Sequence, residues 1–313
     1  VILVKLMTEI SDHIIDVDTI TQTVEKRRTC VWYDNVKNYY EGILQVAKKH
    51  MHLLDEELHS LPMVTIEQAS KAQSGKLNFI TCYPDDIELN IGESTAIAGR
   101  AALASLGRAV KDIKDKQADA LVTAPFNKEN VQSDVFHFSG HTEYLTHTFS
   151  AGESLMMMVS EHMRVALVCN HVPLHEVSSQ ITEENILNKL SLLSATLHDD
   201  FRIVKPKIAV LALNPHAGDN GLIGSEENDV IRPALQKAKE TGMIVYGPYA
   251  ADGFFGTGMY QQFDAILGMY HDQVLIPFKS LDMSGVNFTA GLPIIRTSPD
   301  HGTAYDIAGK NQA

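Results

Sequence analysis

Short apolar runs rich in β-branched residues alternate with amphipathic segments from about residue 118 to the end of the chain. Runs of about four to eight such residues are typical of buried strands. They predict strands at 119–123, 155–159, 164–168, 207–213 and 265–269. Because strands that alternate with helices usually form parallel sheets, the pattern predicts an α/β fold with a largely parallel sheet.

Apolar positions between these runs recur at the spacing of one helix face. They predict helices over 97–113, 186–197 and 226–241. The first part of the chain has a weaker pattern, which indicates a strand at 29–33 and a helix at 36–49. In parallel α/β sheets, functional residues collect at the carboxyl ends of the strands. The segments that follow each predicted strand are therefore the places where we expect a site.

Composition narrows the class of protein. A chain with 44% hydrophobic and 21% charged residues is typical of ordinary globular proteins rather than disordered ones. The net charge of -13 disfavours a nucleic-acid partner or an anionic membrane surface. Three cysteines without a CxxC motif disfavour a disulfide framework, and no apolar run approaches the roughly 20 residues that span a bilayer. Because the cysteine pattern disfavours a disulfide framework, we expect a protein of the reducing cytoplasm. No signal peptide is visible at the start of the sequence. The chain starts without Met and stops just after a motif, so we expect both ends to be incomplete.

Three histidines directly follow apolar runs that predict strands: His171, His216 and His271. Carboxyl ends of parallel strands meet at one sheet edge, so these imidazoles could converge on one divalent cation. Three protein ligands with open positions are typical of a catalytic metal site. The alternative is that each histidine caps or hydrogen-bonds a loop, and the residues alone leave the two interpretations about equal.

Cations in apolar surroundings form a second set of candidates. Lys279 and Arg296 both lie in largely apolar segments, where a charge is costly unless it is paired. An anionic substrate group and an internal carboxylate are equally good partners on the pattern alone. Asn127 and Lys128 follow the strand predicted at 119–123 and are a further candidate pair.

The segment 298–309 contains His301, Gly302 and Thr303 in a predicted tight turn with exposed backbone donors. Asp306 could accept a hydrogen bond from a ribose or an adenine, although an ordinary loop entering a helix would have the same pattern. Glycine clusters at 218–224 and 253–258 do not have the GxGxxG spacing of a dinucleotide-binding turn. A standard Rossmann cofactor site is therefore not indicated.

The motifs SGHTEYL, NPHAGDNG, GPYAADGFF, MYHDQ, PFK and NFTAGLPIIRTSPDHGTAYDIAGK resemble the 4-hydroxythreonine-4-phosphate dehydrogenase family of pyridoxal phosphate biosynthesis. The resemblance is strong over about 118–313 and weak before residue 88. It implies an isocitrate/isopropylmalate dehydrogenase-like fold with two α/β lobes and a central cleft. The first lobe would comprise 1–124 and 270–313 and carry the cofactor loop. The second, 125–269, would hold metal ligands and contact a second copy in a homodimer.

The resemblance also implies roles for individual residues. His171, His216 and His271 match metal ligands of a site shared across the homodimer interface. The metal would be Zn, Co, Mn or Mg, with imidazoles favouring the first two. Matches to substrate-binding residues are His141, Thr142, Lys279, Asn287 and Arg296. The residues that match the NAD or NADP site of the family are His301, Gly302, Thr303, Ala304 and Asp306. Two positions depart from the family: Val274 replaces a glycine beside His271, and Cys169 and Asn170 replace two threonines before His171.

The implied reaction is the metal-dependent, NAD(P)-linked oxidation of 4-phosphooxy-L-threonine to the 3-oxo acid. This acid then decarboxylates to 3-amino-2-oxopropyl phosphate. Asp252 and Asp272 are candidates for the proton acceptor, although either could instead orient a metal-binding histidine. One alternative is a dehydrogenase of another phosphorylated hydroxy acid, such as erythronate 4-phosphate. Others are a metal-dependent phosphatase and a non-catalytic binding protein.

Overall fold

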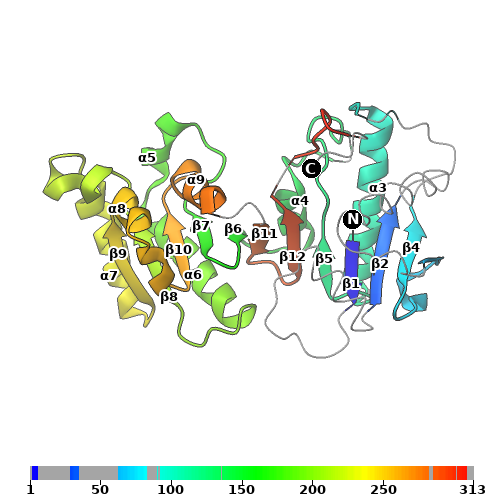
Figure 1. Cartoon of the computed structure of the whole chain (residues 1–313), viewed down its shortest axis with the longest axis horizontal. Helices are drawn as coiled ribbons and strands as arrows, with labels where there is room; N and C mark the ends of the chain where they lie inside the picture. Colours follow the sequence, from blue (N-terminus) through cyan, green and yellow to red (C-terminus); the bar gives the residue numbers. More distant parts are fainter. Residues whose placement is uncertain are drawn as a thin grey trace. The chain divides into compact units, whose positions relative to one another are not determined.

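The computed structural model divides the chain into two compact units (Figure 1). The first unit is Val1–His147 with Ile294–Ala313, and the second is Thr148–Pro293. The chain therefore crosses between the units after residues 147 and 293, later than the crossings predicted after 124 and 269. The structure describes residues 2–5, 29–34, 63–82, 90, 92–134, 136–281, 285–300 and 302–308, so the helix predicted at 36–49 lies outside the described residues.

The second unit contains a mixed sheet in the order β11-β6-β7-β10-β8-β9. Its strands are β6 Leu155–Val159, β7 Arg164–Leu167, β8 Lys207–Leu211, β9 Ile244–Tyr249, β10 Ala265–Gly268 and β11 Val286–Ala290. Strands β7, β10, β8 and β9 are parallel to one another, whereas β6 is antiparallel to both of its neighbours. The strands predicted at 155–159, 164–168, 207–213 and 265–269 are confirmed to within two residues.

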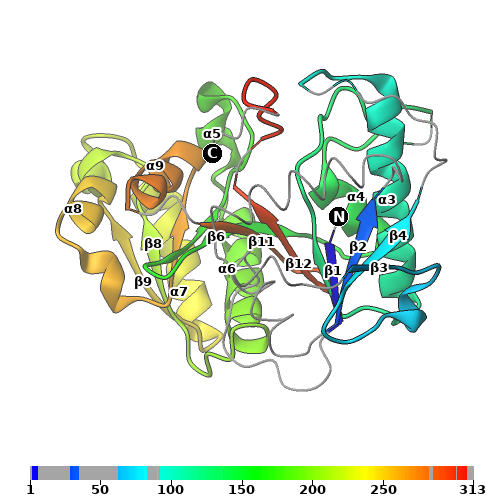
Figure 2. The same ribbon diagram turned by 45° about the vertical axis from the view of Figure 1, so that its right-hand side comes forward.

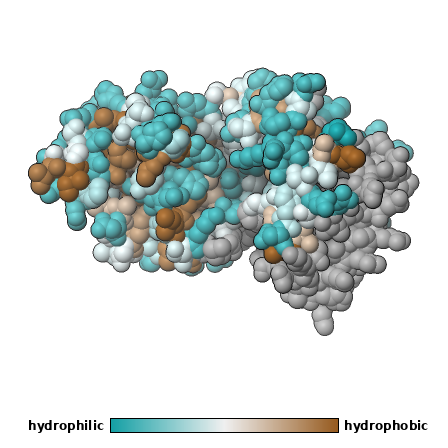
Figure 3. Space-filling model, turned by 90° about the horizontal axis from the view of Figure 1, so that it is seen from above, coloured by the Kyte–Doolittle hydropathy of each residue, from teal (hydrophilic) through white to brown (hydrophobic). Residues whose placement is uncertain are grey.

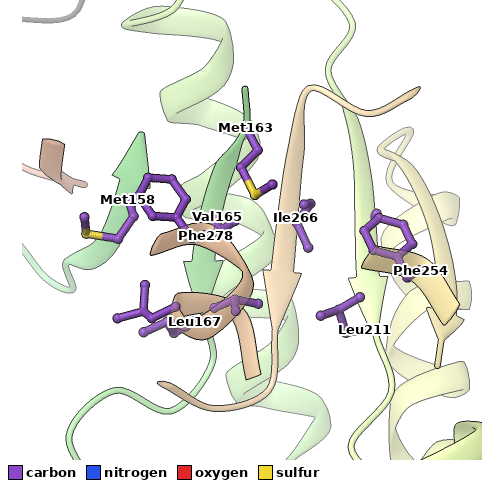
Figure 4. Close-up of a cluster of buried hydrophobic side chains, with 11 residues drawn as sticks. Met158, Met163, Val165, Leu167, Leu211, Phe254, Ile266 and Phe278 are labelled. Atoms are coloured by element: carbon purple, nitrogen blue, oxygen red, sulfur yellow. The ribbon is translucent and has the colours of Figure 1, made fainter. Parts of the chain in front are cut away.

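Alternate residues along a strand point to opposite faces of its sheet. In this sheet, residues on both faces are buried. On one face, strand residues pack with Phe254 and Phe278, which come from α8 Ala251–Gly256 and α9 His271–Leu281 (Figure 4). Ile208 and Val210 lie at the alternate positions of β8 and are also fully buried. The unit's other helices are α5 Val177–Gln180, α6 Glu183–Asp199 and α7 Arg232–Glu240. The helices predicted over 186–197 and 226–241 are thus confirmed, although residues 227–231 form a π-turn before α7.

The first unit contains strands in the order β3-β4-β2-β1-β5-β12. They are β1 Ile2–Lys5, β2 Thr29–Asp34, β3 Met63–Thr65, β4 Leu77–Thr81, β5 Ala120–Val122 and β12 Ile295–Pro299. Strands β3, β4 and β2 are parallel, as are β5 and β12, whereas β1 is antiparallel to both of its neighbours. The strands predicted at 29–33 and 119–123 are confirmed, and the α/β class holds for both units.

Helix α3, Ala96–Lys114, packs against this sheet (Figure 2). Its start is fixed by Thr95, whose hydroxyl accepts a hydrogen bond from Ala98 N at 3.2 Å, as an N-cap should. The shorter helix α4, His141–Thr148, begins at one of the predicted substrate residues. Of the helices that the structure describes, none combines the length and the apolar character needed to cross a membrane.

Candidate active site

The three candidate metal ligands follow three adjacent parallel strands of the second unit. Strands β7, β10 and β8 lie side by side and end at residues 167, 268 and 211, a few residues before His171, His271 and His216. Because these strands run in the same direction, their exits share one edge of the sheet. The strand-end positions that we predicted from the apolar runs are therefore present in the fold.

Hydrogen bonds tie these strand exits together. Cys169 N donates to Met269 O at 3.0 Å, which continues the pairing of β7 with β10 beyond the strands. The Gln273 side chain accepts from Met269 N at 2.7 Å and donates to Ala212 O at 2.6 Å. One amide thus links the exits of β10 and β8, whose loops carry His271 and His216. Gln273 was not among the predicted site residues.

His171 and His271 lie close to each other, with ring centroids 5.5 Å apart. His271 Nδ1 is 2.7 Å from Asp272 Oδ1, so Nδ1 donates to this carboxylate when it carries the ring proton. That arrangement leaves Nε2 as the acceptor nitrogen, as in histidines that bind metals. This contact is the one that an orienting role of Asp272 requires, and that role is one of the two that the sequence leaves open for it.

His216 lies in a left-handed turn, with φ between 41° and 80° from His216 to Asn220. Residues other than glycine lose roughly 1–2 kcal/mol each in this conformation. The turn is therefore strained, and contacts with neighbouring residues must stabilise its conformation. Among the residues that the structure describes, no group of three His, Cys, Asp or Glu side chains could hold a metal ion. One copy of the chain brings His171 and His271 together, but it does not add His216 to the same cluster.

Arg296 lies in the first unit, on β12, and is only 4% exposed. Its Nη2 donates to the Thr123 hydroxyl at 2.7 Å. Burial lowers the pKa of this guanidinium to about 10, and the nearby Glu143 carboxylate partly opposes that shift. The side chain thus remains a cation at neutral pH. Thr123 directly follows β5, so the pairing of β5 with β12 brings the two groups together.

His141 lies at the start of α4, and its ring packs against that of Phe126 with centroids 3.8 Å apart and the planes tilted by 32°. Burial is the largest cause of a pKa lowered to about 2, and Arg296 lowers it further. The imidazole is therefore neutral at physiological pH. A neutral ring has one donor and one acceptor nitrogen, so it can bind a polar substrate group without adding charge.

A pocket of about 290 Å³ lies in the first unit beside the predicted cofactor loop. Gly302 and Thr303 line it together with Tyr305, and α3 contributes Ala98 and Ala102. The small α3 side chains keep this side of the pocket open. Of the other predicted cofactor residues, Ala304 has a left-handed φ of 48°, Asp306 is exposed, and His301 lies outside the described residues.

The remaining predicted residues divide between the units. Thr142 is half-buried on α4 of the first unit. Lys279 on α9 and Asn287 on β11 are half-buried and belong to the second unit. Asp252 is exposed on α8 of the second unit. The predicted substrate residues therefore come from both units, as do the predicted metal and cofactor residues taken together.

Residues 36–313 match the family described as "Pyridoxal phosphate biosynthetic protein PdxA". The chain belongs to this PdxA family. It is 48% identical over 274 residues to the 4-hydroxythreonine-4-phosphate dehydrogenase of Bacteroides thetaiotaomicron. The aligned region covers 87% of this chain and 74% of that protein. A Bradyrhizobium diazoefficiens relative with D-threonate 4-phosphate dehydrogenase in its name is 43% identical over 234 residues, 71% of this chain and 68% of the relative. The crystal structure of 4-hydroxythreonine-4-phosphate dehydrogenase from Klebsiella pneumoniae matches with a TM-score of 0.71 and 33% identity, over 81% of this chain and 77% of that one. Because these relatives are dehydrogenases, the PdxA chain is an oxidoreductase.

The valine at position 274 is accommodated within the PdxA fold. Val274 is fully buried on α9 and packs in the core between that helix and β10. A Cβ on Gly268 would lie 2.4 Å from Val274 Cγ1, so the absence of a side chain at Gly268 makes room for the valine. The substitution thus fills the space above a strand glycine and leaves His271 at the start of its helix.

The other departure lies beside His171. Cys169 is buried, and burial raises the pKa of its thiol, so it serves as an apolar packing residue. Asn170 Oδ1 is buried and accepts no hydrogen bond from the part of the chain that the structure describes. A buried acceptor of this kind is costly unless a donor reaches it.

Proposed function

We propose that this protein catalyses the metal-dependent, NAD(P)-linked oxidation of 4-phosphooxy-L-threonine to the 3-oxo acid. That acid then decarboxylates to 3-amino-2-oxopropyl phosphate, a step of pyridoxal 5'-phosphate biosynthesis. The observation that carries the proposal is the set of histidines after three adjacent parallel strands, in a chain of the PdxA family. The names of its relatives support the choice of substrate.

The donor set suits a divalent metal ion. His171, His271 and His216 offer imidazole nitrogens, which favour zinc or cobalt over manganese or magnesium. Since one chain gathers only His171 and His271, His216 would come from the second copy of a homodimer. The bound ion would supply Lewis acidity that makes a substrate hydroxyl easier to deprotonate.

Exposed apolar residues support the homodimer. Leu174 is 74% exposed, Leu222 81% and Ile276 64%, and they lie on the three segments that follow β7, β8 and β10. These are the segments that carry the histidines. Figure 3 shows several apolar areas on one face of the second unit. A contiguous apolar patch is typical of a protein–protein interface, and these three side chains are its candidate members.

The chain's own residues then have defined tasks. Arg296 and Lys279, with Thr142 and Asn287, would hold the substrate phosphate and its polar groups through charge-assisted hydrogen bonds. Neutral His141 would bind a substrate hydroxyl or carboxylate beside Arg296. Asp272 would orient His271, which leaves Asp252 as the candidate proton acceptor.

The pocket beside Gly302 and Thr303 would hold the adenosine part of NAD or NADP, the hydride acceptor of the reaction. Exposed Asp306 would accept a hydrogen bond from the ribose or the adenine at its rim. We also propose that the protein is cytoplasmic, since cysteines without a disulfide pattern suit a reducing compartment.

The test is NADH formation from 4-phosphooxy-L-threonine, followed by absorbance, with and without a metal chelator. Chelator-sensitive turnover supports the reaction and its metal together. His216→Ala should abolish this turnover while leaving the circular dichroism spectrum unchanged. Full turnover of His216→Ala would contradict the metal assignment. Phosphate release without NAD would instead indicate a phosphatase.

A second substrate deserves the same assay, because one relative has D-threonate 4-phosphate in its name. That molecule keeps the phosphate and the neighbouring hydroxyl but lacks the amino group. Erythronate 4-phosphate completes the panel. A kcat/KM at least tenfold higher for either compound than for 4-phosphooxy-L-threonine would change the substrate and leave the metal and cofactor roles intact.

A further inference from the structure

A buried carboxylate lies against the turn that carries His216. Glu227 is 1% exposed and begins the π-turn Glu227–Ile231 that precedes α7. Its Oε1 accepts from Asn214 N at 2.7 Å, and its Oε2 accepts from Asn214 Nδ2 at 3.0 Å. Asn214 stands two residues before His216. Both oxygens of one buried acid are therefore used to hold the start of the histidine loop.

Two glycines let the loop close tightly around this contact. A Cβ on Gly218 would lie 2.6 Å from Glu227 Oε2, and a Cβ on Gly224 would lie 2.4 Å from Asn214 Nδ2. Both glycines also have positive φ, at 80° and 84°. Any side chain at either position would push the acid and the amide apart. The loop is thus shaped around the pair formed by Glu227 and Asn214.

The turn needs an anchor of this kind. His216, Ala217, Asp219 and Asn220 all adopt positive φ without being glycine. His216, Asp219 and Asn220 are exposed, so core packing does not fix their side chains. Asn214, at the start of this segment, donates to carboxylates from both N and Nδ2: its N bonds to Glu227 Oε1, and its Nδ2 bonds to Glu227 Oε2 and, at 2.7 Å, to Glu226 Oε2. Of these two acids Glu227 is the buried one, and it also accepts from the Asn214 backbone.

We propose that Glu227 is a positioning residue for His216, acting through Asn214 and the left-handed turn. Without its two hydrogen bonds the turn relaxes toward ordinary backbone conformations, and the imidazole leaves the position that suits a metal ion. The inference rests on the proposed role of His216 as a metal ligand. It assigns the buried acid a function in metal affinity rather than in contact with substrate.

The test measures Co²⁺ affinity of the full chain by competition with a chelator. Glu227→Gln replaces one acceptor oxygen by a donor that opposes the Asn214 amide, and should weaken Co²⁺ binding about 10- to 100-fold, as loss of an outer partner usually does. Asp229→Asn is the matched control, since Asp229 is an exposed acid in the same π-turn. It should bind Co²⁺ as the wild type does. Saturating Co²⁺ should restore most of the Glu227→Gln turnover, which a general loss of structure would prevent.

Two outcomes separate this inference from the function beneath it. If His216→Ala binds Co²⁺ like the wild type, the proposed metal role of His216 fails and this inference fails with it. If His216→Ala loses binding but Glu227→Gln keeps wild-type affinity, only the positioning role is overturned. Should Glu227→Gln not fold, Asn214→Ala removes the side-chain bonds to Glu227 and Glu226 and keeps the backbone bond to Glu227. This variant should bind Co²⁺ several-fold more weakly, and unchanged affinity would overturn the inference.

Discussion

The two units prepare their parts of the proposed site by different physical means. In the second unit, hydrogen bonds of Gln273 and Glu227 hold backbone loops whose histidines remain exposed or half-buried. In the first unit, Arg296 and His141 are shifted by desolvation, which lowers the pKa of both groups. The second unit thus positions its candidate ligands through hydrogen bonds to the backbone, whereas the first unit changes the acid–base properties of its candidate residues through burial. Exposed imidazoles can exchange a metal ion with solvent, whereas the charge of a buried guanidinium is costly to remove from water.

The largest effect should come from the second unit. His271→Ala removes a ligand that Asp272 orients, so metal-dependent kcat/KM should fall by more than about a hundredfold, beyond the usual loss from an outer partner. Metal content and NADH formation measure the result. Asp272→Asn is the companion variant and should cost less, since the imidazole itself remains. An equal loss in both would show that the carboxylate does more than orient the ring.

Arg296→Met tests the first unit in the same assay. It removes a buried charge-assisted contact worth about 1.5–3 kcal/mol, so kcat/KM should fall about 10- to 150-fold. Co²⁺ affinity should not change, because the guanidinium serves the substrate. Weakened Co²⁺ binding in this variant would contradict the assignment of substrate binding to the first unit and metal binding to the second.

His141 gives the first unit a pH dependence. Its pKa is about 2 in the folded chain and near 6.5 when unfolded, so the unfolded state binds the extra proton as the pH falls below 6.5. The depressed pKa therefore makes the folded chain less stable in acid, over the range from about pH 6.5 down to pH 2. Between pH 7 and pH 5 the wild type should lose about 2 kcal/mol of unfolding free energy through this group.

Urea unfolding at the two pH values measures that loss. His141→Gln removes the titrating ring and keeps hydrogen-bonding groups, so its stability should depend less on pH by the same amount. His137→Gln is a suitable control, because His137 is exposed in the same unit. Equal pH dependence in wild type and His141→Gln would contradict the burial argument.

The smallest effect concerns Phe126, whose ring packs against His141. Phe126→Leu keeps an apolar side chain but loses the aromatic contact, which is worth about 0.5–1.5 kcal/mol. We expect a rise in substrate KM of about two- to tenfold with little change in kcat. A loss of kcat at unchanged KM would mean that Phe126 acts on the reacting geometry instead.

Continuous apolar runs made much of the second unit predictable. Strand β6 matches its prediction residue for residue, because Leu155 to Val159 is uninterrupted. Strand β9 was missed, since Gly247 and Pro248 usually mark a turn or an edge. Strands β11 and β12 were missed because polar residues such as Asn287 and Arg296 interrupt the apolar pattern.

The sequence predicts the candidate site less completely than it predicts the fold. The strand-end positions of the histidines follow from sequence order, since each loop directly follows an apolar run. The left-handed turn does not, because His216 and Ala217 have no feature that predicts positive φ. Glu227 was also hidden, since a single acid in an amphipathic helix pattern is usually a surface residue. Its burial depends on Asn214, which lies on another element and meets it only in the folded chain.

The side-chain amide of Gln273 also makes one backbone proton a measure of motion in the site. Met269 N donates to this side chain, so deuterium exchange of the Met269 N–H requires the Gln273 side chain to move away. The same movement breaks the hydrogen bond to Ala212 O, one residue after β8. The exchange rate of one backbone proton thus measures how often the two histidine loops separate, in solution and before any cation is added.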